Sequence, residues 1–364
     1  MKEKKTPLYH NHLSLNGKMV SFSGFLLPTF YSSINFEHQI VRSKVGLFDV
    51  CHMGELIISG NDAESFIQKI TINNIKAIGV GQAQYTAMCY NDGGIVDDLI
   101  IYKYYDKYMM VVNASNIEKN LSWIKKNIDG DVKIENKSDE IGLLAIQGPK
   151  SRKVLEHLMN LNLRSLPFYH FIQEKYGGED LTIARTGYTG ELGYELYIDS
   201  KSIVKLWNVL MDSGSKFEIY PVGLGCRDTL RLEMAYPLYG NDIDDSISPL
   251  EGGLGWITKF KKGNFIGKTS LEKDKNKIKR KLVCIEMNEK SIPRNGCLIY
   301  KNRKLIGKIT SGTMSPSIGK GIALGLIDKT FASIGIGLEI DIRGRIKRGT
   351  IVTSPFFKKG TLLN

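Results

Sequence analysis

The chain has 364 residues, of which 42% are hydrophobic and 24% charged, and its formal net charge is +12. This length exceeds one ordinary core, so two or three domains are expected, and the composition excludes general disorder. The five cysteines include no C-x-x-C pair, which favours reduced thiols in a cytoplasm over a zinc site or disulfide framework. Because no run of about 18 apolar residues occurs and the N-terminal charges precede no apolar segment, neither a membrane span nor a signal peptide is expected.

The net charge of +12 permits an anionic partner such as nucleic acid, a membrane surface or an acidic protein. The basic residues are scattered along the chain, however, and a solvated surface explains such scatter simply. No aromatic–basic recognition motif accompanies them, so nucleic-acid binding has no support beyond the charge.

The first third of the chain predicts strands, a tight turn and two helices. Asn61 or Asp62 is expected near the N-cap of the first helix, and Ser115 with Glu118 forms an S-x-x-E capping box for the second. The expected strands are His52–Gly60, Gln82–Tyr90, Ile95–Tyr104 and Tyr108–Ala114, with a turn at Asn91–Gly94.

Helices are also expected after Gln147–Ser151 and at Ser202–Gly214, with two strands around a Gly-rich loop between them. Because strands and helices mix without a regular βαβ rhythm, the fold class is expected to be α+β. The basic segment 273–281 is expected to be a linker between interleaved α+β subdomains in 1–272 and a C-terminal β-barrel in 282–364.

The stretch Gly93–Tyr102 places two adjacent carboxylates, Asp97 and Asp98, in an apolar strand, where an unpaired charge is costly. Successive strand residues alternate faces, and periodicity alone leaves open which Asp faces a pocket. Asp97 lies beside the turn and is explained by capping of the turn's N–H groups. Asp98 lies deeper and shares a face with Tyr102, which suits proton transfer because burial raises a carboxyl's pKa.

Two further segments combine residue types that suit ligand binding. Arg185–Glu195 fits either an ordinary hairpin or a loop that approaches a flat heterocycle, whose ring edge donates two N–H bonds to a carboxylate. Gly223–Asp244 places Arg227, Asp228 and Arg231 at helical spacings. These are either surface ion pairs or a site where an arginine holds an anionic or carbonyl group.

Other catalytic motifs are incomplete. Gly263–Ser270 resembles a phosphate loop but has three residues between its glycines where the motif needs four, so an NTPase is rejected. The Gly-x-Gly pairs lack the strand–helix context of a dinucleotide fold. The histidines show no H-E-x-x-H spacing, and His52 is interpreted as a strand-end residue rather than a ligand.

Seven motifs stand in order along the chain: VGLFDVCHMGEL, GGIVDDLIIY, VVNASNIEKNLSWI, QGPKS, RTGYTGELGYEL, GLGCRDTLRLEMAYPLYGNDID and FIGK. This order resembles that of the aminomethyltransferase family of the glycine cleavage system, the T-protein family. The stretch ITSGTMSPSIGKGIALGLI is also similar to that family's terminal barrel. The resemblance covers nearly the whole chain, and the shared order is specific although each motif alone is weak.

The resemblance implies a reaction in which the methylene carbon of an aminomethyl group, carried on the lipoyl arm of H-protein, passes to tetrahydrofolate. The products are 5,10-methylenetetrahydrofolate, ammonia and dihydrolipoyl H-protein. Tetrahydrofolate is then a co-substrate and H-protein the protein partner, without a metal, nucleic acid or membrane. The implied fold has mixed α/β subdomains around a central folate pocket, followed by the β-barrel.

By the same resemblance, Asp98 is the catalytic residue, which orients the reacting nitrogens and helps to move the proton lost as the one-carbon bridge closes. Asp97 is its structural partner, Glu195 binds the pterin edge, and Arg227 holds a polar or anionic part of the folate. Phe357 follows the final Pro-Phe, where some relatives carry a folate-contacting aromatic residue, and it lacks a hydroxyl. The expected folate-binding residues are Met53, Tyr85, Asp98, Tyr102, Asn113, Tyr188, Glu195 and Arg227.

The alternative within the same fold is a folate-binding tRNA-modification or iron–sulfur assembly factor. Such factors carry a Lys-Gly-Cys segment followed by Gly-Gln, whereas the corresponding region here reads AYPLYGNDID, without cysteine. The basic surface is matched to an acidic H-protein that docks beside the pocket and directs its lipoyl arm inward.

Overall fold

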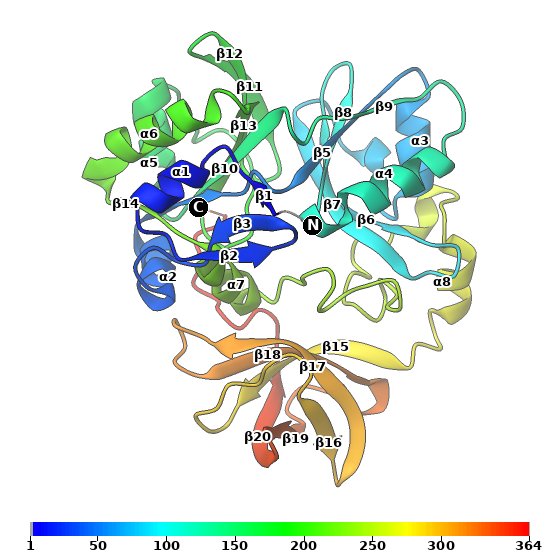
Figure 1. Cartoon of the computed structure of the whole chain (residues 1–364). Helices are drawn as coiled ribbons and strands as arrows, with labels where there is room; N and C mark the ends of the chain where they lie inside the picture. Colours follow the sequence, from blue (N-terminus) through cyan, green and yellow to red (C-terminus); the bar gives the residue numbers. More distant parts are fainter. Residues whose placement is uncertain (1–2, 364) are drawn as a thin grey trace.

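The fold is built from four β-sheets, which a computed structural model describes over residues 3–363 (Figure 1). The first three sheets have three, six and five strands, and the fourth is a closed barrel. Helices are interspersed among the strands, so the predicted α+β class with a C-terminal barrel is confirmed. No helix within this described part is long and apolar enough to cross a membrane.

One half of the N-terminal region is the six-stranded sheet with two helices packed on it. Its elements are β4 (Val45–Asp49), β10 (Ile141–Gln147), α5 (Ser151–Met159), β11 (Phe171–Tyr176), β12 (Glu179–Ala184), β13 (Gly193–Asp199), α6 (Ile203–Gly214) and β14 (Ile219–Pro221). The strand order is β11-β12-β13-β10-β4-β14. Apolar residues at helical spacing bury one face of each helix against the sheet, including Val154, Leu155, Trp207 and Leu210.

The other half is the five-stranded sheet. Its elements are β5 (Gly54–Ser59), α3 (Ala63–Ile70), β6 (Gln82–Cys89), β7 (Ile95–Lys103), β8 (Tyr108–Val112), α4 (Ile117–Lys126) and β9 (Lys133–Asn136). The order β6-β7-β8-β5-β9 contains the predicted meander. Asp62 is the N-cap residue of α3, but its carboxylate accepts the N–H of Asp131 instead of capping the helix.

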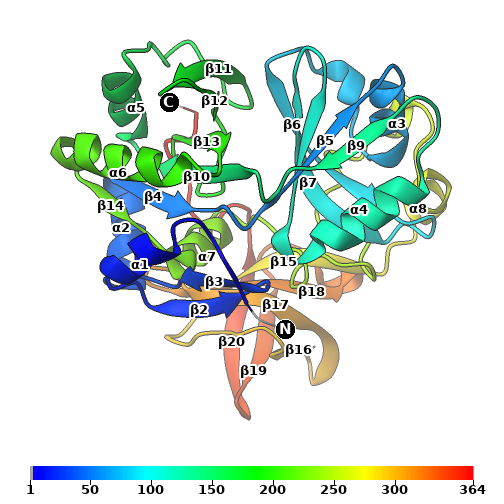
Figure 2. The same ribbon diagram turned by 45° about the horizontal axis from the view of Figure 1, so that its top comes forward.

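The two sheets stand side by side and share an apolar layer between them (Figure 2). Tyr102 and Val111 enter this layer from the five-stranded sheet, and Leu143 and Tyr197 enter it from the six-stranded sheet. Because strand residues alternate, their sequence neighbours point the other way and pack against the helices. The layer between the sheets is therefore the place where side chains of both halves meet.

A small sheet precedes these two halves, and two helices follow them. The elements are β1 (Lys4–Lys5), α1 (Tyr9–Ser14), β2 (Met19–Phe22), β3 (Phe25–Pro28), α2 (Ile34–Ser43), α7 (Leu224–Glu233) and α8 (Lys268–Asp274). Helix α2 begins at an N-cap serine, Ser33, whose side chain accepts the N–H of Phe36. Helix α2 packs against α7 at the base of the N-terminal region.

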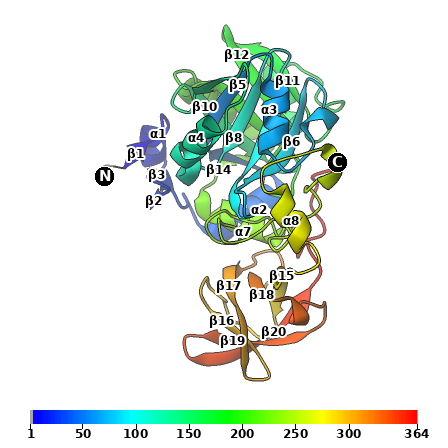
Figure 3. The ribbon, with the colours of Figure 1, turned by 90° about the vertical axis from the view of Figure 1, so that its right-hand side faces the viewer.

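The barrel lies beyond the two halves, with α7 and α8 near the junction (Figure 3). Its strands are β15 (Arg280–Met287), β16 (Leu298–Lys301), β17 (Lys304–Met314), β18 (Gly321–Asp328), β19 (Gly337–Ile342) and β20 (Arg345–Val352), closed in the order β15-β18-β17-β16-β19-β20. The chain then returns to the N-terminal region, where the N–H of Phe357 bonds Glu233 and the N–H of Leu362 bonds Gly190.

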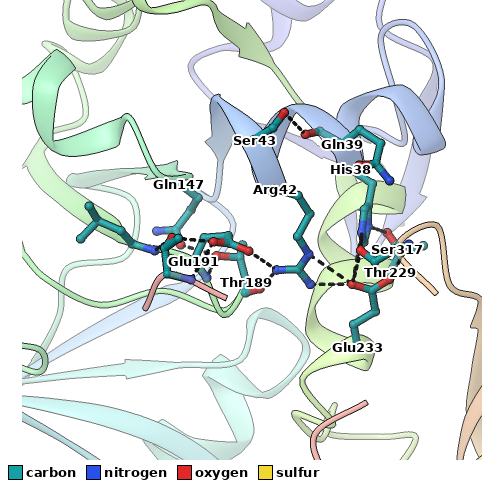
Figure 4. Close-up of polar contacts among 12 residues, drawn as sticks. His38, Gln39, Arg42, Ser43, Gln147, Thr189, Glu191, Thr229, Glu233 and Ser317 are labelled. Atoms are coloured by element: carbon teal, nitrogen blue, oxygen red, sulfur yellow. Dashed lines mark hydrogen bonds and ion pairs between the residues drawn. The ribbon is translucent and has the colours of Figure 1, made fainter. Parts of the chain in front are cut away.

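A buried ionic network, the Arg42 network, joins these parts (Figure 4). The Arg42 guanidinium of α2 donates to Glu191 Oε1 and to Glu233 Oε2, each at 2.7 Å. Glu233 of α7 also accepts the hydroxyl of Ser317 from the barrel at 2.8 Å. The ring of Phe357 lies 4.2 Å from the guanidinium carbon, which gives this residue a packing role. One arginine thus connects α2, the β12–β13 loop, α7 and the tail.

Candidate active site

A cavity of about 700 Å³ lies between the two halves and reaches the barrel strands β15 and β18. Its wall combines residues that are far apart in the sequence, because each half contributes one sheet face. Seven of the residues expected to bind folate line it: Met53, Tyr85, Asp98, Asn113, Tyr188, Glu195 and Arg227. The eighth, Tyr102, is fully buried and lies behind the wall.

Asp98 is the carboxylate of the acid pair that faces the cavity. One of its oxygens accepts the hydroxyl of Tyr85 at 2.9 Å, and the other lies 2.8 Å from the side-chain nitrogen of Asn113. Tyr85 is supplied by β6, Asp98 by β7 and Asn113 follows β8, so three neighbouring strands position this group. The indole of Trp256 stacks on the Tyr85 ring with the centroids 6.2 Å apart.

Asp97 points to the opposite face of β7 and is fully buried. Its oxygens accept side-chain N–H groups from Asn113 and Asn116 at 2.8 Å, and from Asn120. The prediction that Asp97 caps the preceding turn is therefore wrong. The carboxylate of Asp92 caps that turn, because it lies two residues before Gly94 and accepts its N–H at 3.0 Å.

The predicted Ser115–Glu118 capping box is also wrong. The chain enters α4 through a short 3-10 turn at Ala114–Asn116. The N-cap residue is Asn116, and its side chain makes no capping hydrogen bond to the helix. The amide of Asn116 turns toward Asp97 instead. Tertiary hydrogen bonding to a buried carboxylate thus outweighs local helix capping at this position.

Burial and the adjacent Asp97 charge raise the pKa of Asp98 to about 7. Burial also raises the pKa of Asp97, and the asparagine amides oppose that rise. Two carboxylates this close cannot both ionise freely, and the amides around Asp97 favour the charge there. Asp98 is left as the group that gains or loses a proton near neutral pH, as proton transfer requires.

Glu195 faces the cavity from β13 and is held from behind. Its Oε2 accepts the hydroxyls of Thr186 at 2.5 Å and Tyr102 at 3.2 Å. Tyr102 in turn accepts a bond from the hydroxyl of Tyr197 at 2.9 Å. Tyr102 therefore acts on the site through Glu195. The other carboxylate oxygen of Glu195, Oε1, accepts no hydrogen bond from the described residues 3–363 and is available to a ligand.

Arg227 and Tyr188 form a second polar region of the cavity wall. The guanidinium carbon of Arg227 lies 4.8 Å from the Tyr188 ring centre, and the Tyr188 hydroxyl donates to the carbonyl of Pro237. Arg227 makes no ion pair with any carboxylate within residues 3–363. Its charge is therefore available to a polar or anionic ligand group.

Arg231 lies one turn after Arg227 in α7, and one interpretation of the sequence was that it forms a surface ion pair with Asp228. The structure shows the ion pair but not the surface position. The pair exists at 2.7 Å, but the Arg231 side chain is buried and also contacts Asp242 at 2.8 Å. Asp242 accepts the barrel hydroxyls of Thr310 and Ser311. Spacing along α7 predicted the first contact, whereas the barrel that covers it could not be read from that spacing.

His52 was interpreted from sequence as a strand-end residue, and the structure places it in the cavity wall. It is buried, its Nδ1 has no hydrogen-bond partner, and the edges of Phe22 and Phe25 pack on its ring. Burial and the charge of Arg227 lower its pKa to about 4, so the imidazole is neutral. The sequence signal that could have placed His52 in the cavity wall is that it directly precedes Met53, which was expected to bind folate.

Comparison with known proteins agrees with this architecture. Residues 8–262 match the family model of the GCVT N-terminal domain, and residues 280–358 match that of the glycine cleavage T-protein C-terminal barrel domain. An aminomethyltransferase of Bacillus subtilis is 46% identical, with 98% of this chain and 99% of the relative covered. One of Halothermothrix orenii is 48% identical over 97% of this chain and 99% of the relative.

A solved structure of glycine cleavage system aminomethyltransferase T from Bartonella henselae has a TM-score of 0.92 to this chain. The two are 28% identical, and the likeness covers 98% of this chain and 99% of the other. The chain belongs to the glycine cleavage T-protein family. Nothing in these comparisons supports the alternative of a tRNA-modification or iron–sulfur assembly factor.

Proposed function

We propose that the chain transfers the methylene carbon of an aminomethyl group on the lipoyl arm of H-protein to tetrahydrofolate. The products are 5,10-methylenetetrahydrofolate, ammonia and dihydrolipoyl H-protein, and the reaction is reversible. The observation that carries this proposal is Asp98, a half-buried acid with a pKa of about 7 in the wall of a cavity large enough for a folate. No residue described here needs to act as a covalent nucleophile, because the folate nitrogen attacks and the lipoyl sulfur leaves.

Glu195 accepts the two N–H groups on the pterin edge, and its hydroxyl partners hold the carboxylate in place. Arg227 holds a polar or anionic part of the folate. Met53, Tyr85, Asn113 and Tyr188 complete the wall around the ring. Tyr102 contributes through its bond to Glu195.

Asp98 acts on the nitrogens that form the one-carbon bridge. When the second folate nitrogen bonds to the transferred carbon, the bond from that carbon to the amine breaks and ammonia leaves. The folate nitrogen also loses a proton, which the Asp98 carboxylate accepts. The fixed hydroxyl of Tyr85 and the amide of Asn113 hold the carboxylate for this transfer. Positioning and exclusion of water from the cavity supply the remainder of the rate.

The protein partner in this proposal is an acidic H-protein in the cytoplasm, which binds beside the cavity. The net charge of +12 supports attraction of such a partner. Raising the ionic strength should therefore raise KM for H-protein several-fold with little change in kcat, because salt screens long-range attraction. Steady-state assays between low and physiological salt measure this, and a KM that does not respond to salt contradicts the docking proposal.

Ammonia release from aminomethylated H-protein, measured with and without tetrahydrofolate, tests the function directly. Release that depends on tetrahydrofolate supports the proposal, and an inactive wild type contradicts it.

Replacing Glu195 with glutamine should weaken tetrahydrofolate binding by about 10- to 100-fold, because one charged acceptor of the pterin N–H groups is lost. Calorimetric titration measures the Kd. Glu179→Gln on the exposed edge of β12 is the matched control and should bind as wild type does. Equal affinity of the Glu195→Gln variant would remove Glu195 from the site.

A further inference from the structure

A second glutamate, Glu55, lies in β5 next to the cavity without lining it. One row of side chains crosses the five-stranded sheet on the face that points to the cavity: Tyr85 pairs with Ile100, Ile100 with Val111, and Val111 with Glu55. The first three residues of this row line the cavity. Glu55 is the fourth, and it lies below the wall where the two sheets meet.

The Glu55 carboxyl is buried without any hydrogen-bond partner. Its side chain is 1% exposed, and neither oxygen has a donor within the described residues 3–363. An ionised carboxylate in such a place loses its hydration and gains nothing in return, whereas a neutral acid loses far less. The isolation of both oxygens therefore favours the protonated form.

The groups around Glu55 also favour that form. Glu195 and Tyr197 approach it from β13, and Cys51 approaches it from the turn between β4 and β5. The hydroxyls of Thr186 and Tyr102 are both directed to Glu195, and none is directed to Glu55. No cationic side chain of the described chain stabilises Glu55, so a second negative charge here would stand beside Glu195 without compensation.

We propose that Glu55 is a neutral carboxylic acid in the working protein, and that its proton allows Glu195 to be the one charged carboxylate at this end of the cavity. Loss of that proton as pH rises places a second negative charge beside Glu195, which weakens both the fold and folate binding. The folate part of this inference rests on the proposed function, whereas the neutral state of Glu55 does not. Glu55 is thus a positioning residue that acts through Glu195.

Burial and the nearby Glu195 raise the pKa of Glu55 well above its ordinary value. A carboxyl whose pKa is raised by folding favours the folded state below its unfolded pKa, and this contribution is lost as pH rises toward the folded pKa. The affinity for folate should then fall about tenfold for each pH unit above that pKa. Glutamine has the shape of the neutral acid and cannot ionise, so the Glu55→Gln variant should lack both losses.

The test compares wild type, Glu55→Gln and the exposed control Glu179→Gln over pH 6 to 9.5. Thermal unfolding without ligand should occur at a higher temperature in Glu55→Gln than in wild type and Glu179→Gln, by a margin that widens as pH rises from 6. The infrared band of a protonated carboxyl at neutral pH should be weaker in Glu55→Gln than in wild type. Asp97 and Asp98 titrate in all three proteins, so the difference between wild type and Glu55→Gln isolates Glu55.

Titration with tetrahydrofolate should give equal Kd values at pH 6.5 and a rise at pH 9 that is smaller in Glu55→Gln. Parallel unfolding curves and an unchanged infrared band would overturn the inference, and so would a Glu55→Gln variant that loses folate at pH 6.5. A wild type that binds no folate at any pH would refute the proposed function, while the unfolding and infrared measurements would still decide the state of Glu55.

Discussion

Replacing Asp98 with asparagine should lower kcat for ammonia release by about 10²- to 10⁴-fold, the usual contribution of a positioned proton-transfer group. Asparagine can accept the amide N–H of Asn113 through its oxygen and donate its own N–H to the Tyr85 hydroxyl oxygen, but it cannot accept a proton. Tetrahydrofolate should therefore bind within a few-fold of the wild-type Kd. Single-turnover assays with aminomethylated H-protein, together with calorimetry, separate the two effects.

Asp97→Asn is the comparison that distinguishes the two acids. The Asp97 carboxylate accepts hydrogen bonds from the side-chain N–H groups of three asparagines. An asparagine at this position would place its own NH2 group next to one of these donors, where neither can accept a hydrogen bond. The free energy of unfolding of this variant should be lower by about 1–3 kcal/mol. Its activity should fall only in proportion to the fraction of protein that is no longer folded. An Asp98→Asn variant with full activity would refute the acid–base role, and positioning alone would then have to account for the rate.

The same assignment predicts a pH dependence. Because the pKa of Asp98 is about 7, the activity of wild type should rise as pH increases through 7 and the carboxylate forms. A raised folded pKa favours folding at low pH, and that contribution is lost as pH rises through 7. Asp98→Asn should therefore gain in unfolding temperature relative to wild type between pH 5 and pH 8, which a thermal scan at each pH measures.

Arg42→Met should destabilise the protein by about 3–5 kcal/mol, because it leaves buried carboxylates without their cation. The side chains of Arg42, Glu191 and Glu233 are 5%, 1% and 0% exposed. Burial alone would raise the pKa of Glu233, but the hydrogen bond and charge of His38, together with Arg42, lower it to about 2. Urea unfolding at pH 7 measures the loss.

Lys137→Met is the matched control, because it removes a lysine from exposed ion pairs with Glu135 and Glu140. Its unfolding midpoint should stay close to that of wild type, since exposed pairs contribute little. An Arg42→Met variant as stable as Lys137→Met would show that the Arg42 network does not hold the barrel and tail to the N-terminal region.

Local patterns in the sequence were sufficient for much of the fold. Alternation marked the meander of β6, β7 and β8, and apolar spacing marked α5 and α6, because the period of each element is a property of its own backbone. The strand position of Asp98 next to Asp97 already indicated an acid with an unusual environment. The order of the motifs along the chain was enough to indicate the family, because this order is a property of the sequence and does not depend on which residues touch in the folded protein.

Only the tertiary structure decided which groups meet. Asp97 accepts hydrogen bonds from asparagine side chains instead of capping the turn before it. Arg231 is buried beneath the barrel, and Tyr102 lies behind the cavity wall, where it donates to Glu195. Glu55 came to lie beside Glu195 although 140 positions separate them in the sequence. The reason is physical: a buried polar group is satisfied by whichever partner the packing of distant elements brings within hydrogen-bond distance, and periodicity within one element carries no information about that partner.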